Sequence, residues 1–172
     1  MYTYRFYNVF STKASPIVDD TNRTIGSVAR YYESSSKRIV DKLLKGRIFV
    51  NYQVTDANQQ VVFLSKKATN PFNRRQYHLS YFKNNEEHNV HLIDQKTFDL
   101  GETTTFDYNG GTYELIKQPL EKAIIKKDGT LVAEWDNTMS VPSKAHFELR
   151  DEDYKEDELF FLGVFHTYFH AG

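Results

Sequence analysis

The 172-residue sequence contains no cysteine. This absence excludes disulfides, cysteine-ligated metal centres and a cysteine nucleophile. The first residues, "MYTYRFYNVF", also lack a cationic segment followed by an apolar one, so we expect no secretory signal and a cytoplasmic protein. A chain of this length can bury a core without covalent cross-links, and we expect one domain over residues 1–172.

Catalytic signatures are lacking as well. The sequence has no G-x-S-x-G motif, and "NGG" at 109–111 is not followed by the Lys-Ser/Thr pair of a phosphate-binding loop. Acidic residues are plentiful, but no pair of carboxylates can be assigned to opposite sides of a cleft. We therefore expect a non-enzymatic protein with no cofactor and no bound metal.

Long hydrophobic runs are limited to the last segment, "DELFFLGVFHTYFHAG" at 157–172. Its apolar part spans the 13 residues 159–171, whereas a transmembrane helix needs about 20, so we expect no transmembrane segment. The acidic "DEDYKEDE" before it favours a helix N-terminus, and we prefer a helix to a strand here. On a helix the apolar side chains cover a stripe about 200° wide, which predicts burial on nearly every side.

Short strand-like segments separated by polar turns make up most of the remaining sequence. The 13 Phe and 12 Tyr favour strands, because flat rings pack well on a pleated surface. Asp-Gly at 128–129 is the strongest turn signal, since a type I′ turn needs positive φ angles. The hairpin candidates are "SPIVDDTNRTIGSV" (15–28), "NYQVTDANQQVVFL" (51–64), "KNNEEHN" (83–89), "YNGGTY" (108–113) and "AIIKKDGTLVAEW" (123–135). The pattern predicts a β-rich antiparallel fold, with the apolar helix inside a closed sheet.

One segment in the first half, "SSSKRIVDKLLKGR" at 34–47, predicts a short amphipathic surface helix. Ser36 is the candidate N-cap, and Gly46 can end the helix. We expect its apolar stripe to dock on the barrel, because so short a helix needs tertiary support. Alternatively, the helix lies on an anionic bilayer. The stripe consists of Ile39, Val40, Leu43 and Leu44.

The order of these elements resembles the tubby C-terminal-like domain group. The segments that carry the resemblance are those at 15–28, 51–64 and 123–135, with the short helix after the first hairpin and the apolar helix at the end. The group includes the LURP-one-related proteins and the phospholipid scramblases, and the chain is most similar in size to its small uncharacterised bacterial members. The resemblance implies a closed antiparallel barrel of about twelve strands around a central C-terminal helix. The membrane segment and metal-binding motif of scramblases have no counterpart, so we do not expect lipid scrambling.

Charge is divided unevenly along the chain. Residues 1–90 carry a net charge of +7 and residues 91–172 a net charge of −8. Two basic groups stand out, namely Lys37, Arg38, Lys42, Lys45 and Arg47 in the short helix, and Lys66, Lys67, Arg74 and Arg75 around "ATNPFN". Paired arginines suit phosphate recognition, and tubby, within the similar group, binds phosphoinositide headgroups. We expect this half to contact anionic phospholipid at the inner membrane face or another phosphate-bearing partner. Nucleic acid is the phosphate-bearing partner that we expect least. The alternative is that the two halves attract each other within the fold.

Two other functions stay open. A protein-interaction or structural domain would have a protein partner and no lipid role. A metal-dependent hydrolase would use His166 and His170, which are spaced i and i+4 but have Thr167 where a zinc protease has its glutamate. We favour a polar helix end that reaches water or a backbone carbonyl. In "EEHNVHLID", His88 and His91 should point to opposite faces of a strand.

Overall fold

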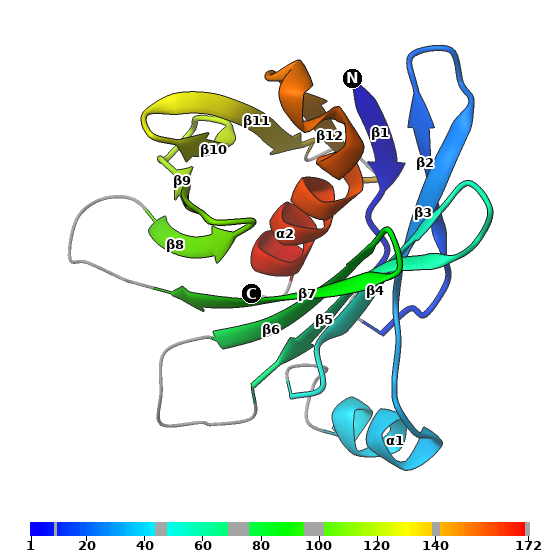
Figure 1. Ribbon diagram of the computed structural model, residues 1–172. Coiled ribbons are helices and arrows are strands. Elements are labelled where there is room, and N and C mark those ends of the chain that lie inside the picture. The colour runs from blue at the N-terminus through cyan, green and yellow to red at the C-terminus, as the bar shows by residue number, and fades with distance from the viewer. Residues whose placement is uncertain (9, 44–47, 69–75, 95–101, 139–141, 171–172) are drawn as a thin grey trace.

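The computed structural model describes residues 1–8, 10–43, 48–68, 76–94, 102–138 and 142–170 (Figure 1). Within these residues the chain forms a closed barrel of twelve antiparallel strands with a helix at its centre. The strands are β1 Tyr2–Arg5, β2 Ser15–Asp19, β3 Thr24–Arg30, β4 Asn51–Asp56, β5 Val61–Lys67, β6 Gln76–Lys83, β7 Glu86–Asp94, β8 Glu102–Tyr108, β9 Gly111–Lys117, β10 Ala123–Lys127, β11 Thr130–Asn137 and β12 Lys144–Leu149. The predicted fold class is confirmed.

Each strand pairs with its neighbour in sequence, and β1 closes the ring against β12 with Tyr2 opposite Phe147. Local turn chemistry sets this register. At the β2–β3 turn, the Asp19 side chain accepts hydrogen bonds from the Thr21 and Arg23 amides. Asp128 and Gly129 have φ of 50° and 79° between β10 and β11, as the predicted type I′ turn requires. The hairpins predicted from Asp-led turns are therefore confirmed.

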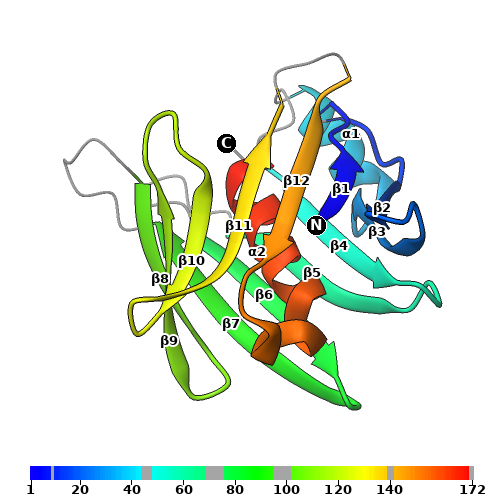
Figure 2. The same ribbon diagram turned by 90° about the horizontal axis from the view of Figure 1, so that it is seen from above.

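Helix α2 (Glu158–His170) runs through the middle of the barrel (Figure 2). Every residue from Phe160 to Tyr168 is buried, so the predicted all-round burial is confirmed. Strand side chains alternate between the helix and solvent, as for β9, where Tyr113 and Leu115 point inward. Helix α2 comes so close to β5 that a Cβ on Gly163 would lie 2.7 Å from the Phe63 ring.

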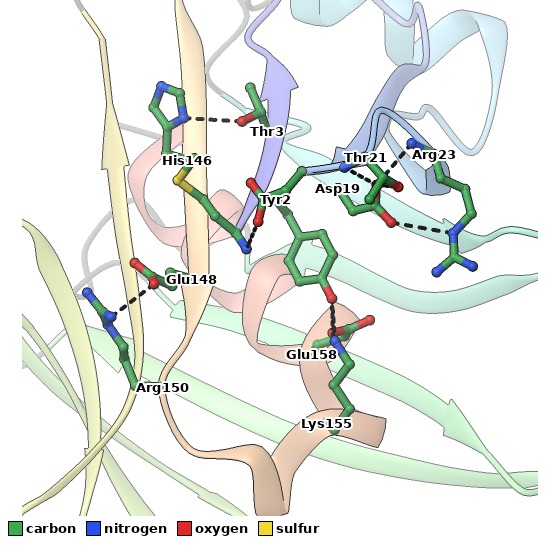
Figure 3. A network of polar contacts seen from close by, with 12 residues as sticks. Tyr2, Thr3, Asp19, Thr21, Arg23, His146, Glu148, Arg150, Lys155 and Glu158 are labelled. Carbon is green, nitrogen blue, oxygen red and sulfur yellow. Dashed lines mark hydrogen bonds and ion pairs between the residues drawn. The ribbon is translucent and has the colours of Figure 1, made fainter.

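Polar contacts fix the start of α2. The short 3₁₀ helix η1 (Glu152–Asp157) precedes it. The Tyr2 hydroxyl of β1 donates to Glu158 at 2.6 Å, and the Lys155 ammonium binds the same carboxylate at 2.7 Å (Figure 3). On the other side, Lys83 forms an ion pair with the buried Asp157 at 2.8 Å. These contacts set the depth to which the helix enters the barrel.

Candidate functional site

Helix α1 (Ser35–Leu43) lies outside the barrel, in the connection between β3 and β4 (Figure 1). Ser34 precedes it, and its hydroxyl accepts the Lys37 amide at 3.3 Å. Ser34 rather than the predicted Ser36 therefore caps the helix. The predicted C-terminal Gly46 lies outside the described residues.

The buried residue of α1 is charged. The Asp41 carboxylate is 0% exposed and pairs with the Arg30 guanidinium of β3, which is 3% exposed, at 2.7 Å. It also accepts the Tyr32 hydroxyl at 2.8 Å and the amides of Ile48 and Phe49 at 3.0 Å each. We call these five residues the Asp41 cluster. A buried carboxylate with this many donors is satisfied, so the cluster fixes α1 on the barrel.

Tyr32 keeps its proton in this cluster. Burial, followed by its hydrogen bond to Asp41, raises the pKa of Tyr32 to about 12. The hydroxyl therefore remains a neutral donor to Asp41 at all physiological pH values.

The apolar stripe of α1 faces solvent. Ile39, Val40 and Leu43 are 63%, 43% and 79% exposed. The prediction that this stripe docks on the barrel is wrong, because Asp41 occupies the docked face and lies opposite Ile39 and Leu43 on the helix. Leu44 lies outside the described residues.

The two predicted basic groups meet at one carboxylate. Glu33 lies between β3 and α1, and its side chain accepts hydrogen bonds from Lys37 of α1 and, at 2.7 Å, from Lys66 of β5. These contacts, Lys37 first, lower the pKa of Glu33 to about 2. Arg38 and Lys42 are exposed. We call Lys37, Arg38, Lys42 and Lys66 the basic edge, whereas the half-buried Lys67 is on the inward face of β5 with Phe63 and Ser65.

Four predicted residues cannot be placed with the basic edge. Lys45, Arg47, Arg74 and Arg75 lie outside the described residues. Their predicted role stays a prediction.

Two histidines continue the basic edge across the sheet, and sequence reasoning missed this pair. Lys66 of β5 is opposite His78 of β6, which is opposite His91 of β7. The two exposed imidazole rings stack with centroids 4.7 Å apart and planes at 8°. Partial burial and then His78 lower the pKa of His91. His88 lies instead against the Tyr108 ring, which confirms that His88 and His91 point to opposite faces.

A surface pocket of about 340 Å³ lies beside the start of α1. Two arginines, Arg30 and Arg38, are among its lining residues, and its other polar lining residues are Thr12, Tyr31, Tyr32, Ser34, Ser35 and Gln53. The Tyr31 hydroxyl is shielded from solvent and has no hydrogen-bond partner among the described residues. The pocket therefore combines Arg38, and Arg30 with its ion pair to Asp41, with hydroxyl groups, a combination that suits an anionic oxygen ligand.

His166 and His170 lie at the opposite end of α2 from Glu158. His166 is buried, its Nδ1 lies 3.3 Å from the Tyr4 hydroxyl, and its ring packs edge-on against Tyr52. The prediction that this end reaches water or a backbone carbonyl is wrong for His166, which is buried. It is confirmed for His170, which bonds the Tyr7 backbone carbonyl. Burial holds the pKa of His166 well below its usual range and lowers that of His170 to about 4.

The described residues show no group of three or more His, Cys, Asp or Glu arranged to hold a metal ion. In that same part of the chain, no helix combines the length and the apolar character needed to cross a membrane.

The whole chain can be compared with known protein families. Comparisons with curated proteins and with solved structures give no match. The model of the Tubby C-terminal like domain family matches residues 2–171, which is essentially the complete sequence and includes every strand of the barrel, α1 and α2. The chain therefore belongs to the Tubby C-terminal like domain family.

Proposed function

We propose that the protein is a non-enzymatic binding module that attaches to anionic phospholipid headgroups through the basic edge. The observation that supports this most is the shared contact at Glu33, which places cations of α1 and of β5 side by side outside the barrel. Family membership supports a binding role in general. We place the protein in the cytoplasm, with peripheral contact at the inner membrane face.

The charges of the basic edge have the sign and exposure that such a contact needs. Each cation close to an anionic membrane surface contributes about 1 kcal/mol to binding. Arg38 and Lys42 are exposed, whereas Glu33 is shared between Lys37 and Lys66 and offsets only part of their charge. Lys45, Arg47, Arg74 and Arg75 belong to the same two sequence groups, and we include them in the proposed contact.

The pocket beside α1 suits a phosphate group of the lipid. Arg38, Ser34 and Ser35 are among the residues that line it. A guanidinium together with hydroxyl donors can hold phosphate oxygens by charge-assisted hydrogen bonds.

Co-sedimentation with vesicles tests this proposal. We expect the protein to bind vesicles that contain phosphatidylserine, to release them as salt is raised, and to leave pure phosphatidylcholine vesicles unbound. Reversing two exposed charges in Arg38→Glu/Lys42→Glu should weaken binding by about tenfold or more. The control is Lys122→Glu/Lys126→Glu, which makes the same change in net charge around β10, across the barrel from α1 (Figure 1), and also breaks the Lys122–Glu134 ion pair.

Three results would contradict the proposal. They are absence of binding at low salt, equal binding to neutral and anionic vesicles, and equal loss in the two double variants. A stoichiometric protein partner that binds without the basic edge would instead support a protein-interaction domain.

A further inference from the structure

We infer that α1 inserts its exposed apolar face into the bilayer, so that the contact is hydrophobic as well as electrostatic. This inference rests on the proposed function and names how the same surface meets the lipid. The inserted side chains are Ile39, Val40 and Leu43, which the barrel leaves 63%, 43% and 79% exposed. Large apolar side chains gathered on one helix face in this way mark an interaction surface.

The arrangement around α1 is that of an interfacial helix. At about 100° per residue, Ile39, Val40 and Leu43 share one arc about 100° wide. Lys42 borders this arc on one side and Lys37 on the other, whereas Arg38 and Asp41 lie on the far side of the helix, each about 100° from the arc. Cations on both sides of an apolar arc can reach headgroup phosphates while the arc enters the acyl layer.

The charge pattern favours a bilayer over a second copy of the chain. In a symmetric dimer the same patch meets itself, so the cations of one copy would face those of the other. An anionic bilayer offers apolar chains beneath a layer of negative charge, which complements both parts of the surface.

The fold prepares α1 for this contact. Isolated helices of this length are unstable in water, so a free segment would have to fold as it bound. The Asp41 cluster and the Ser34 cap hold α1 in its helical form, with the apolar arc turned away from the barrel. Binding therefore does not have to order this segment.

The absence of cysteine allows a direct test with a single labelled site. Leu43→Cys, labelled with an environment-sensitive nitrobenzoxadiazole group, reports the surroundings of α1. Leu120→Cys is the matched control, since Leu120 is a fully exposed leucine in the connection between β9 and β10, and β10 lies across the barrel from α1 (Figure 1). With phosphatidylserine vesicles we expect a blue shift and quenching by acyl-brominated lipid at position 43 and neither effect at position 120.

The binding of unlabelled variants supplies the second measurement. Ile39→Ser/Leu43→Ser should reduce vesicle binding by about tenfold or more, whereas Leu120→Ser should leave it unchanged. Both positions are solvent-exposed, so the variants should keep the fold of the parent protein, which circular dichroism can verify.

Together, these measurements distinguish failure of insertion from failure of headgroup binding. If the protein sediments with anionic vesicles but the label at position 43 stays in water, insertion is refuted and headgroup binding stands. If nothing sediments at low salt, both are refuted. If the label shifts without vesicles as protein concentration rises, a second copy covers the face and insertion is refuted.

Discussion

Replacing Asp41 tests how α1 is held to the barrel. Asp41→Ala removes the acceptor of four hydrogen bonds, which come from Arg30, Tyr32 and two backbone amides. It also leaves the Arg30 guanidinium, only 3% exposed, without its carboxylate. Breaking one side of a buried ion pair costs about 3–5 kcal/mol.

Most of this loss of free energy is relieved if α1 detaches from the barrel. The helix lies outside the closed sheet, so its departure opens Arg30 to water without breaking the strand ladder. We therefore expect local opening rather than global unfolding. A cost of about 3 kcal/mol corresponds to about a hundredfold faster amide hydrogen exchange in α1, while amides of β8 to β11 keep their protection.

Hydrogen exchange followed by mass spectrometry measures this effect. Asp41→Asn keeps the shape and one acceptor, so it should open α1 less than Asp41→Ala does. Adding Arg30→Met to Asp41→Ala should restore part of the protection, because no unpaired charge remains buried. Unchanged protection of residues 38–43 in Asp41→Ala would refute the role given to the cluster.

Three further predictions concern the core. His170 has a pKa of about 4 in the fold against an ordinary 6.5, so its contribution to stability is complete above about pH 6.5 and is lost as the pH falls toward 4. By this linkage the free energy of unfolding should fall by about 2 kcal/mol between pH 7 and pH 5 through His170, and His170→Gln should flatten that part of a urea-denaturation series. Phe165→Ala should lower the free energy of unfolding by about 3–5 kcal/mol in the same assay, since Phe165 is fully buried; a loss below 1 kcal/mol would contradict the central position of α2. Gly163→Ala should destabilise by about 1–3 kcal/mol despite its better helix propensity, because the new methyl group meets Phe63, and Phe63→Leu in the same chain should recover part of the loss.

The sequence predicts those parts of the fold that depend on neighbouring residues. The turn at Asp128 and Gly129 is set by the backbone preferences of two adjacent residues. The burial of α2 follows from an apolar stripe too wide for a surface helix. Family resemblance then supplies the barrel around it, because the number and closure of strands are not visible in any single segment.

The docked face of α1 could not be predicted in the same way. The helical pattern places Ile39 and Leu43 on an apolar stripe, and such stripes usually face a core. Asp41 reverses this arrangement, because its partner Arg30 lies in β3, 11 residues earlier, and is buried where the helix docks. In the sequence Asp41 is a single aspartate among basic residues, and this pattern does not indicate that Arg30 is its partner.

The basic edge depends on strand register as well. Lys37 and Lys66 meet at Glu33 only because β5 lies next to β4 in the ring. The stacked pair of His78 and His91 requires β6 and β7 to align within one residue. Sequence reasoning instead compared His88 with His91, which share a strand and face opposite ways.

Nuclear magnetic resonance of the whole protein on anionic nanodiscs tests the central claim most directly. With nanodiscs that contain phosphatidylserine, we expect amide signals of α1, of Glu33 and of Lys66 to shift or broaden first, while those around Leu120 and β10 keep their free positions. Perturbation centred on β9 to β11, or none in α1, would contradict the claim that α1 and the basic edge form the membrane contact.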